Sequence, residues 1–312
     1  TLEPLDQGTR AIAAFMLTKT KAELLAAALD RNLLIAPVTT TRDVLELDHL
    51  AERSFWDRVD LSGAIDVNPA VSKRAANLRM CGPFARMSRT PLVALQPPPR
   101  LGQHTAAVMN NLERRPATTG GEHGLERPLS GIKVLDFMWA LAGPGATRML
   151  ADLGATVVKI ESETYPDVLR GAGPFRGDDG DPEGAFQFHS LNAGKLGVAL
   201  DMKHDKAKEV ILDLARWADV VTDSFSAGAM ARWGLGPEDL HAVNPNLVIL
   251  QSNLMGDTGP MAHYAGFGTM AAAIAGFYPI TGWPDRAPAG PFTAFTDYIS
   301  PRLAAAAILA AL

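Results

Sequence analysis

The stretch Gly131–Glu161, GIKVLDFMWALAGPGATRMLADLGATVVKIE, decides the fold of this chain. An apolar strand is predicted at 132–137, a tight turn holds Gly-Pro-Gly at 143–145, and a helix follows over 145–153. A second apolar strand is predicted at 156–160. A strand, a helix and a strand within so few residues indicate a right-handed parallel crossover. The sequence therefore predicts an open α/β sheet, in which ligands bind outside the carboxyl ends of the strands.

The same alternation continues along the chain. Further strands are predicted at 196–200, 219–223 and 247–252, and further helices at 205–217, 226–232 and 237–242. From residue 129 onward we therefore expect an open, mostly parallel, Rossmann-like sheet with flanking helices.

The upstream part has a different pattern. We predict two helices within 8–29, a buried strand at 32–38 and a short helix at 40–50 capped by Thr41. A hairpin-like segment is predicted at 55–66, an extended or looped chain over 82–101 and a short helix at 105–112. Residues 113–128 are polar and rich in Gly, Pro and Thr, which is typical of a linker.

The composition narrows the class of protein. The chain has 312 residues, 47% hydrophobic and 20% charged, with a formal net charge of −5. A mildly acidic chain without a basic stripe is a poor candidate for binding nucleic acid or an anionic membrane. No apolar run is long enough to span a bilayer and no leader peptide is recognisable.

The single cysteine, Cys81, suits a reducing cytoplasm and is expected to be a small core or loop residue rather than a nucleophile. The chain opens on Thr1 and stops inside an alanine-rich helix, so we expect it to be a piece of a longer protein.

Several chemistries are disfavoured. Glu161 ends the second strand as a ribose-binding acid would, but the preceding turn lacks the G-x-G-x-x-G of a dinucleotide site, and Gly171-Ala172-Gly173 follows no strand directly. The acidic loop 177–184 lacks the alternating ligands of a calcium site. The chain has neither an H-E-x-x-H zinc pair nor a G-x-S-x-G hydrolase elbow. A dinucleotide-dependent oxidoreductase stays the weaker alternative.

Residues 129–312 resemble the N-terminal half of a family III CoA-transferase, the group that includes formyl-CoA transferase. The resemblance rests on six blocks in the same order: LSGIKVLDFMWALAGPGATRMLADLGATVVKIE at 129–161, LNAGKLGVALDMK at 191–203, ADVVTDSFSAGAMARWGL at 218–235, NPNLVILQSN at 244–253, ITG at 280–282 and FTDY at 295–298.

Residues 1–112 resemble the C-terminal end of the same family, through NLLIAPVTTTRDVLELDHLAERSFW and PPPRLGQHTAAVMNNL. The C-terminal signature thus precedes the N-terminal one. This order favours the middle slice of a tandem fusion, with circular permutation as the alternative. Since the family forms interlocked dimers, the resemblance implies an interlocked homodimer or a pseudo-dimer of fused units.

The resemblance implies an enzyme that moves CoA from an acyl-CoA to a carboxylic acid acceptor, with no permanently bound cofactor and no metal. Asp297, within FTDY, matches the family's catalytic aspartate. Its carboxylate would attack the thioester to give an aspartyl anhydride, and the returning thiolate would form an aspartyl-CoA thioester. From the residues alone, Asp297 would instead be the N-cap of a helix at 299–312.

The resemblance also implies a CoA site. Its positions are Ala140, Leu141, Ala142, Ser162, Leu200, Lys203, Ser224, Phe225, Arg232, Trp233 and Phe267. Two of them depart from the family pattern, because Leu141 replaces a common Gln and Ser162 a common Arg. Lys203 and Arg232 can pair with CoA phosphates, although each is equally explained as a solvated helix charge.

Position 267 separates two activities of the family. The racemase branch places a His thirty residues before the aspartate, and Phe267 stands there in this chain. Because Phe cannot carry a proton, a two-base racemase is disfavoured. The remaining alternative is that this half is a non-catalytic scaffold of a fused enzyme. The departures from the family pattern at Leu141 and Ser162 favour this alternative, and the presence of Asp297 argues against it.

Overall fold

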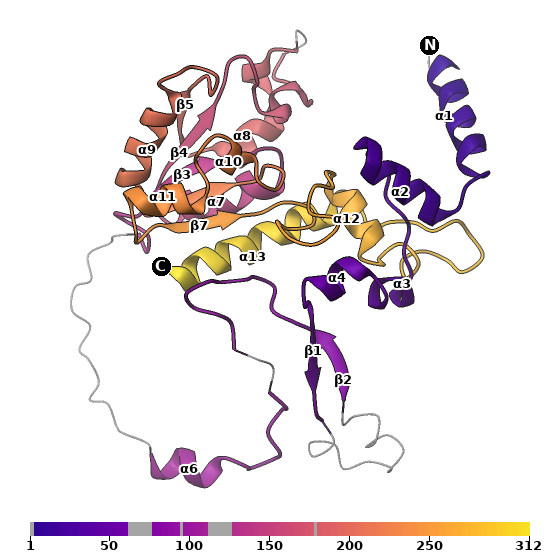
Figure 1. Cartoon of the computed structure of the whole chain (residues 1–312), viewed down its shortest axis with the longest axis horizontal. Helices are drawn as coiled ribbons and strands as arrows, with labels where there is room; N and C mark the ends of the chain where they lie inside the picture. Colours follow the sequence, from indigo (N-terminus) through magenta and orange to yellow (C-terminus); the bar gives the residue numbers. More distant parts are fainter. Residues whose placement is uncertain (1–2, 62–76, 94–95, 112–126, 178–179) are drawn as a thin grey trace. The chain divides into compact units, whose positions relative to one another are not determined.

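The computed structural model describes residues 3–61, 77–93, 96–111, 127–177 and 180–312 (Figure 1). The chain divides into two compact units. The first joins residues 1–49 to residues 129–312, and the second contains residues 50–128.

The first unit contains a five-stranded parallel sheet with the strand order β5-β4-β3-β6-β7. Its strands are β3 (Lys133–Phe137), β4 (Thr156–Glu161), β5 (Leu196–Ala199), β6 (Val220–Asp223) and β7 (Val248–Gln251). All five predicted strands are confirmed to within one or two residues. The central strand is β3, where Val134 pairs with Val157 on one side and Val220 on the other.

Both faces of the sheet are buried. Leu135 and Phe137 point into one core with Ile211, and Val134 points into another with Leu150 and Ile308. Successive side chains of a strand face opposite sides, so a strand covered on both faces is apolar throughout. This explains the continuous apolar runs in the sequence.

Helices α7 and α13 contribute to one core, and α9 and α11 to the other. The helices of this region are α7 (Ala142–Asp152), α8 (Phe186–Asn192), α9 (Ala207–Trp217), α10 (Ala229–Arg232), α11 (Pro237–Val243), α12 (Gly268–Ile274) and α13 (Phe295–Ala311), with short 3₁₀ helices at Val168–Gly171 and Pro182–Gly184.

Helix α7 begins three residues earlier than predicted. The segment 143–145 forms its first turn rather than a separate tight turn. Proline is tolerated there because the first N–H groups of a helix have no partner within the helix. Gly143 is needed, since a Cβ on it would lie 2.6 Å from Cβ of Met138.

The N-terminal segment contains α1 (Glu3–Met16), α2 (Lys21–Arg31), α3 (Thr41–Leu45) and α4 (Asp48–Glu52). The two helices predicted within 8–29 are confirmed, and Thr40 rather than Thr41 caps α3. The strand predicted at 32–38 is wrong. Ile35 and Ala36 of this run are half-buried against the cluster of Tyr264 and Ile274, whereas Leu33 and Leu34 are exposed, and the run forms no strand.

The second unit contains the antiparallel pair β1 (Trp56–Val59) and β2 (Leu78–Cys81), together with α6 (Thr105–Asn110). Strand β1 thus pairs with residues far beyond the predicted hairpin-like segment 55–66, of which 62–66 lie outside the described residues. Residues 113–126 of the predicted linker 113–128 also lie outside them. Cys81 is exposed on β2 rather than placed in a core or loop.

Candidate active site

The carboxyl ends of four neighbouring strands bring sequence-distant residues together. Ser162 follows β4, Leu200 follows β5 and Ser224 follows β6. The backbone N–H of Trp139, just after β3, donates to Oγ of Ser224 at 2.9 Å. The backbone N–H of Leu200 donates to the carbonyl of Glu161 at 2.7 Å. This edge is where an open parallel sheet binds ligands.

The turn between β3 and α7 is held by side chains. The three successive backbone N–H groups of residues 138–140 donate to Asp136 at 2.9 Å, Ser224 at 2.9 Å and Asp167 at 3.2 Å. Ala140 has φ +63°, a conformation that costs a residue with a Cβ about 1–2 kcal/mol. A fixed, strained backbone at a ligand edge is typical of a binding turn.

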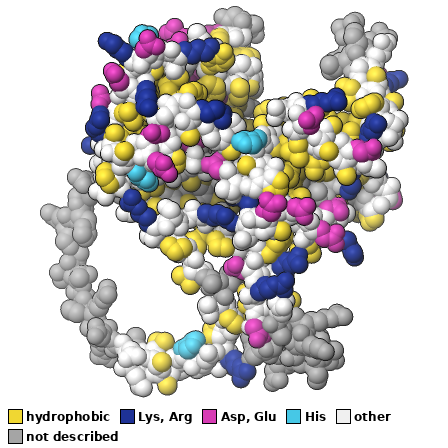
Figure 2. Space-filling view, in the orientation of Figure 1, with side chains coloured by type: hydrophobic (Ala, Val, Ile, Leu, Met, Phe, Trp, Pro, Cys, Tyr) yellow, Lys and Arg dark blue, Asp and Glu magenta, His cyan; other side chains and the backbone are white. Residues whose placement is uncertain are grey.

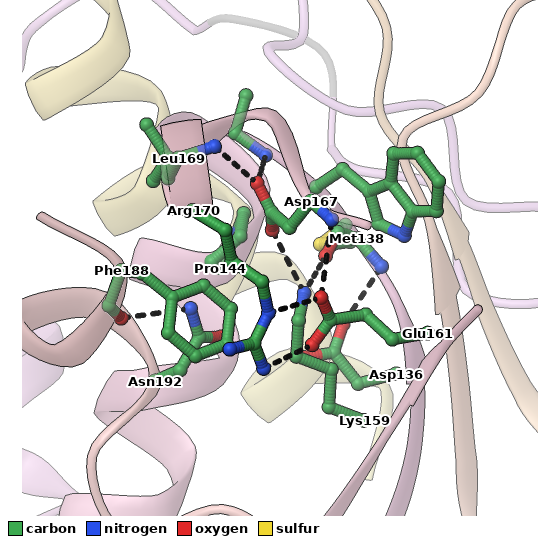
Figure 3. Close-up of polar contacts among 12 residues, drawn as sticks. Asp136, Met138, Pro144, Lys159, Glu161, Asp167, Leu169, Arg170, Phe188 and Asn192 are labelled. Atoms are coloured by element: carbon green, nitrogen blue, oxygen red, sulfur yellow. Dashed lines mark hydrogen bonds and ion pairs between the residues drawn. The ribbon is translucent and has the colours of Figure 1, made fainter. Parts of the chain in front are cut away.

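A buried ion pair supports the same turn. Nζ of Lys159 lies 3.0 Å from Oδ2 of Asp167 and also donates to the carbonyl of Met138 at 2.7 Å. Both charged side chains are at most 3% exposed. Figure 3 shows Lys159 between Met138 and Asp167. The pair therefore links the centre of β4 to the turn.

A second buried pair joins Asp136 to Lys195, whose Nζ lies 3.0 Å from Oδ2 of the carboxylate. The same Nζ donates to Thr147, Asn192 and the carbonyl of Pro144. Burial lowers the pKa of Lys195, and Asp136 opposes that shift. This network ties the first turn of α7 to the end of β3.

Glu161 is fully engaged by a neighbouring arginine. Arg170 donates from Nε and from its terminal nitrogen to the two carboxylate oxygens, at 2.7 and 3.0 Å, and lies 3.7 Å over the ring of Phe188 (Figure 3). Burial alone would raise the pKa of Glu161, but the bonds from Arg170 and from the backbone of Asp167 outweigh it and lower the pKa. A bidentate partner already occupies this carboxylate, which argues further against a ribose-binding role.

Two aromatic residues expected near CoA, Phe225 and Trp233, form a row with Trp139. Phe225 stacks edge-to-face on Trp139 at 5.7 Å and on Trp233 at 5.3 Å. The expected phosphate contacts are exposed: Lys203 lies 5.0 Å over the ring of Tyr165, and Arg232 is on α10. Figure 2 shows basic and acidic side chains interspersed on the face drawn of this region.

Asp297 lies in the first turn of α13, so it is not the N-cap of a helix at 299–312. Its Oδ2 accepts a hydrogen bond from the backbone N–H of Gly268 at 3.2 Å. Burial raises the pKa of the Asp297 carboxyl, and the Gly268 N–H partly offsets this rise. Phe267, exposed, precedes Gly268 as the N-cap of α12 and therefore lies beside the carboxylate.

Asp297 and Leu141 line the same pocket, which has a volume of about 620 Å³. Their helices meet closely: a Cβ on Gly145 of α7 would lie 3.1 Å from Cγ of Pro301 of α13. The structure thus brings Leu141, Phe267 and Asp297 into one region of the first unit.

The sequence profile of CoA-transferase family III matches residues 2–105 and 129–312. The chain belongs to this family.

Individual relatives match only part of the chain. The succinate–glutarate CoA-transferase of Agrobacterium fabrum is 37% identical over 187 residues, which cover 59% of this chain and 47% of that protein. The acetyl-CoA:oxalate CoA-transferase of Acetobacter aceti is 37% identical over 161 residues, 52% of this chain and 40% of that one. The chain therefore spans less than half the length of these relatives.

A crystal structure of a CaiB/BaiF family protein from Brucella suis has the same fold. Its TM-score is 0.56 at 36% identity, over 60% of this chain and 49% of the other. This agreement supports the assignment of the parallel sheet to the family III fold.

Within the described residues, no three His, Cys, Asp or Glu side chains are grouped so as to hold a metal ion. No helix in that part of the chain combines the length and apolar character needed to cross a bilayer.

Three features of this family member were not predicted: the two buried ion pairs and the contact of Gly268 with Asp297. The sequence did indicate one of the buried ion pairs, because Lys159 interrupts the otherwise apolar strand TVVKI. A charged residue at a buried strand position requires a partner. Which residue supplies it depends on the fold.

Proposed function

We propose that residues 129–312 carry the CoA-binding and nucleophilic part of an enzyme that transfers CoA from an acyl-CoA to a carboxylic acid. The observation that carries this proposal is the position of Asp297: half-buried, bonded to one backbone N–H and facing a pocket beside the β3–α7 turn. A poorly solvated carboxylate is a stronger nucleophile than a hydrated one.

The proposed chemistry is a chain of acyl transfers. The Asp297 carboxylate attacks the thioester carbonyl, the C–S bond breaks, and CoA leaves as a thiolate. The thiolate attacks the aspartyl carbonyl of the anhydride, which releases the first acid and leaves an aspartyl-CoA thioester. The acceptor carboxylate then displaces the thiolate, which attacks the acceptor carbonyl of the new anhydride and regenerates the Asp297 carboxylate.

CoA is proposed to lie along the carboxyl edge of the sheet. Its nucleotide would follow the backbone of Ala140, Leu141 and Ala142, with Lys203 and Arg232 on its phosphates. Leu200, Ser224, Phe225, Trp233 and Ser162 would surround the adenosine and pantetheine, and Phe267 the acyl end. The side-chain bonds to residues 138–140 support this placement, since a preorganised turn binds at a smaller entropic cost.

The relatives act on acyl-CoA and carboxylic acid pairs, as their names state: succinate with glutarate, and acetyl-CoA with oxalate. We extend the general reaction to this chain. We also propose a cytoplasmic enzyme, on the basis of its single exposed cysteine.

The architecture proposed is that of two fused family units. Residues 1–112 would belong to the C-terminal part of one unit, 113–128 to a linker, and 129–312 to the N-terminal part of the next, in an interlocked dimer or pseudo-dimer. The family profile supports this by matching two segments separated by residues 106–128. Sequencing of the flanking regions tests it, because fusion requires an N-terminal signature upstream and a C-terminal one downstream.

The decisive experiment replaces the nucleophile in the complete protein. Asp297→Asn should abolish CoA transfer while calorimetry gives an unchanged affinity for CoA, and hydroxylamine trapping of the parent should modify Asp297. Asp285→Asn, an exposed control, should retain activity. Full turnover by Asp297→Asn would refute the mechanism. A parent that binds no CoA would favour the scaffold role, which the replacements Leu141 and Ser162 support.

A further inference from the structure

The pocket beside Asp297 contains basic side chains that the reaction above does not use. Arg148 of α7, His189 of α8 and Arg302 of α13 line it together with Tyr298. In the proposed mechanism the acceptor reacts with the uncharged aspartyl-CoA thioester. A second carboxylate on the acceptor that leaves water for this pocket would need a cationic partner.

Two of these three side chains are held by the protein. Arg148 donates from Nε to Asp152 and from a terminal nitrogen to the carbonyl of Ser190, both at 2.8 Å. Nε2 of His189 donates to the carbonyl of Glu183 at 2.6 Å. Arg148 is thus already paired with a carboxylate, and His189 is held against a backbone carbonyl.

Arg302 differs from both. Its side chain is exposed, and its guanidinium donates to the carbonyl of Tyr298 one turn earlier on the same helix. Among the described residues, no carboxylate forms an ion pair with Arg302. The remaining N–H groups of its planar fork can therefore bind a carboxylate in two-point fashion.

The position of Arg302 along α13 suits a ligand that reaches Asp297. Arg302 lies five positions after Asp297, which corresponds to about 7.5 Å along a helix, and both residues line the pocket. A short acid with a carboxylate at each end can place one end at Asp297 and the other at a guanidinium that extends back along the pocket.

We propose that Arg302 is a specificity-determining residue that binds the distal carboxylate of a short dicarboxylic acid acceptor. The proposal rests on the proposed function, since it places the reacting carboxylate at Asp297. It adds a class of acceptor and the residue that selects it.

The test compares two acids of equal length, succinate and butyrate, with the complete protein. Calorimetric titration into the protein saturated with CoA should give tighter binding of succinate. Arg302→Gln should weaken succinate at least tenfold and change butyrate by less than twofold, while Arg302→Lys restores part of the difference. Arg216→Gln, on the exposed face of α9, is the control and should leave both affinities unchanged.

Transfer assays make the same comparison through the ratio of kcat/KM for the two acids. With acetyl-CoA as the donor, Arg302→Gln should lower kcat/KM for succinate as the acceptor ten- to a hundredfold relative to butyrate as the acceptor. Equal losses for both acids, or no preference for succinate in the parent, would overturn the role of Arg302. A parent that binds no CoA would instead refute the proposed function.

Discussion

The backbone N–H of Gly268 donates a hydrogen bond to Oδ2 of Asp297 across 3.2 Å. A Cβ on Gly268 would lie 2.5 Å from Cγ of the same aspartate. The backbone N–H of Gly268 thus donates to the carboxylate of Asp297, and the absence of a side chain on Gly268 leaves room for that carboxylate. A side chain at position 268 would displace the nucleophile.

Gly268→Ala should therefore lower kcat by about a hundredfold or more, because a shift of about 1 Å in a reacting group costs that much. CoA affinity should change by less than threefold, since the nucleotide would bind elsewhere. The measurement is steady-state CoA transfer combined with calorimetry. Gly8→Ala, whose added Cβ meets nothing within 4 Å, should behave as the parent. An unaltered kcat in Gly268→Ala would show that the contact is not needed.

The Lys159–Asp167 pair gives a prediction about stability. Lys159→Met leaves a buried carboxylate without its charge partner, and should reduce the free energy of unfolding by about 3–5 kcal/mol. The double variant Lys159→Met/Asp167→Asn should recover much of this loss, because Asn removes the charge but keeps an acceptor for the N–H of Ala140. Urea titration measures both.

An exposed pair provides the comparison. Arg216→Ala breaks a surface contact with Asp213 and should change stability little. If Lys159→Met unfolds at the same urea concentration as the parent, the buried pair does not support the turn as inferred.

Asp223 makes stability depend on pH. Burial raises its pKa to about 6, an effect that the Phe225 N–H and Gln251 partly oppose. The folded state therefore binds a proton more tightly than the unfolded state, so this group lowers stability progressively as pH rises from about 4 to about 6. The full cost, on the order of 3 kcal/mol, is present above that range.

Asp223→Asn should remove this dependence. Relative to the parent, the variant should gain stability above pH 6 and gain little near pH 4, as followed by unfolding at several pH values. A stability difference that is the same at pH 4 and pH 7 would contradict the raised pKa.

Two exposed cations should govern the affinity for CoA. Lys203→Ala and Arg232→Ala should each weaken CoA binding about tenfold or more, because a charge-assisted phosphate contact contributes roughly 1.5–3 kcal/mol. The choice of acid should not change. Calorimetry with CoA measures the effect, and Lys206→Ala, exposed three residues beyond Lys203, is the matched control. Unchanged affinity in both variants would remove these residues from the site.

The parallel sheet could be predicted because its signal is local. Each strand is an apolar run and each connecting helix has its own period, so the positions of β3 to β7 follow from the sequence. The run 32–38 has the same apolar pattern, yet it forms no strand, and only part of it packs against the cluster of Tyr264 and Ile274. An apolar run alone does not decide strand pairing, which depends on a partner distant in the chain.

Only those residues of the candidate site that belong to a local sequence motif could be predicted. Asp297 and the turn at 140–142 belong to recognisable blocks, but Asp136 and Lys195 are 59 residues apart and meet only in the fold. The start of α7 was misplaced because a Gly-Pro-Gly sequence is typical of both a turn and a first helical turn.

The contact of Gly145 with the ring of Pro301 contains no rotatable side chain. Neither partner can change rotamer to open or close the gap, so we expect the helix that starts at the binding turn (α7) and the helix that carries Asp297 (α13) to move together as a rigid body. Adjustment to acyl groups of different length must then come from residues outside this pair of helices. Selection for new substrates should accordingly alter the pocket walls and leave the distance from turn to carboxylate constant.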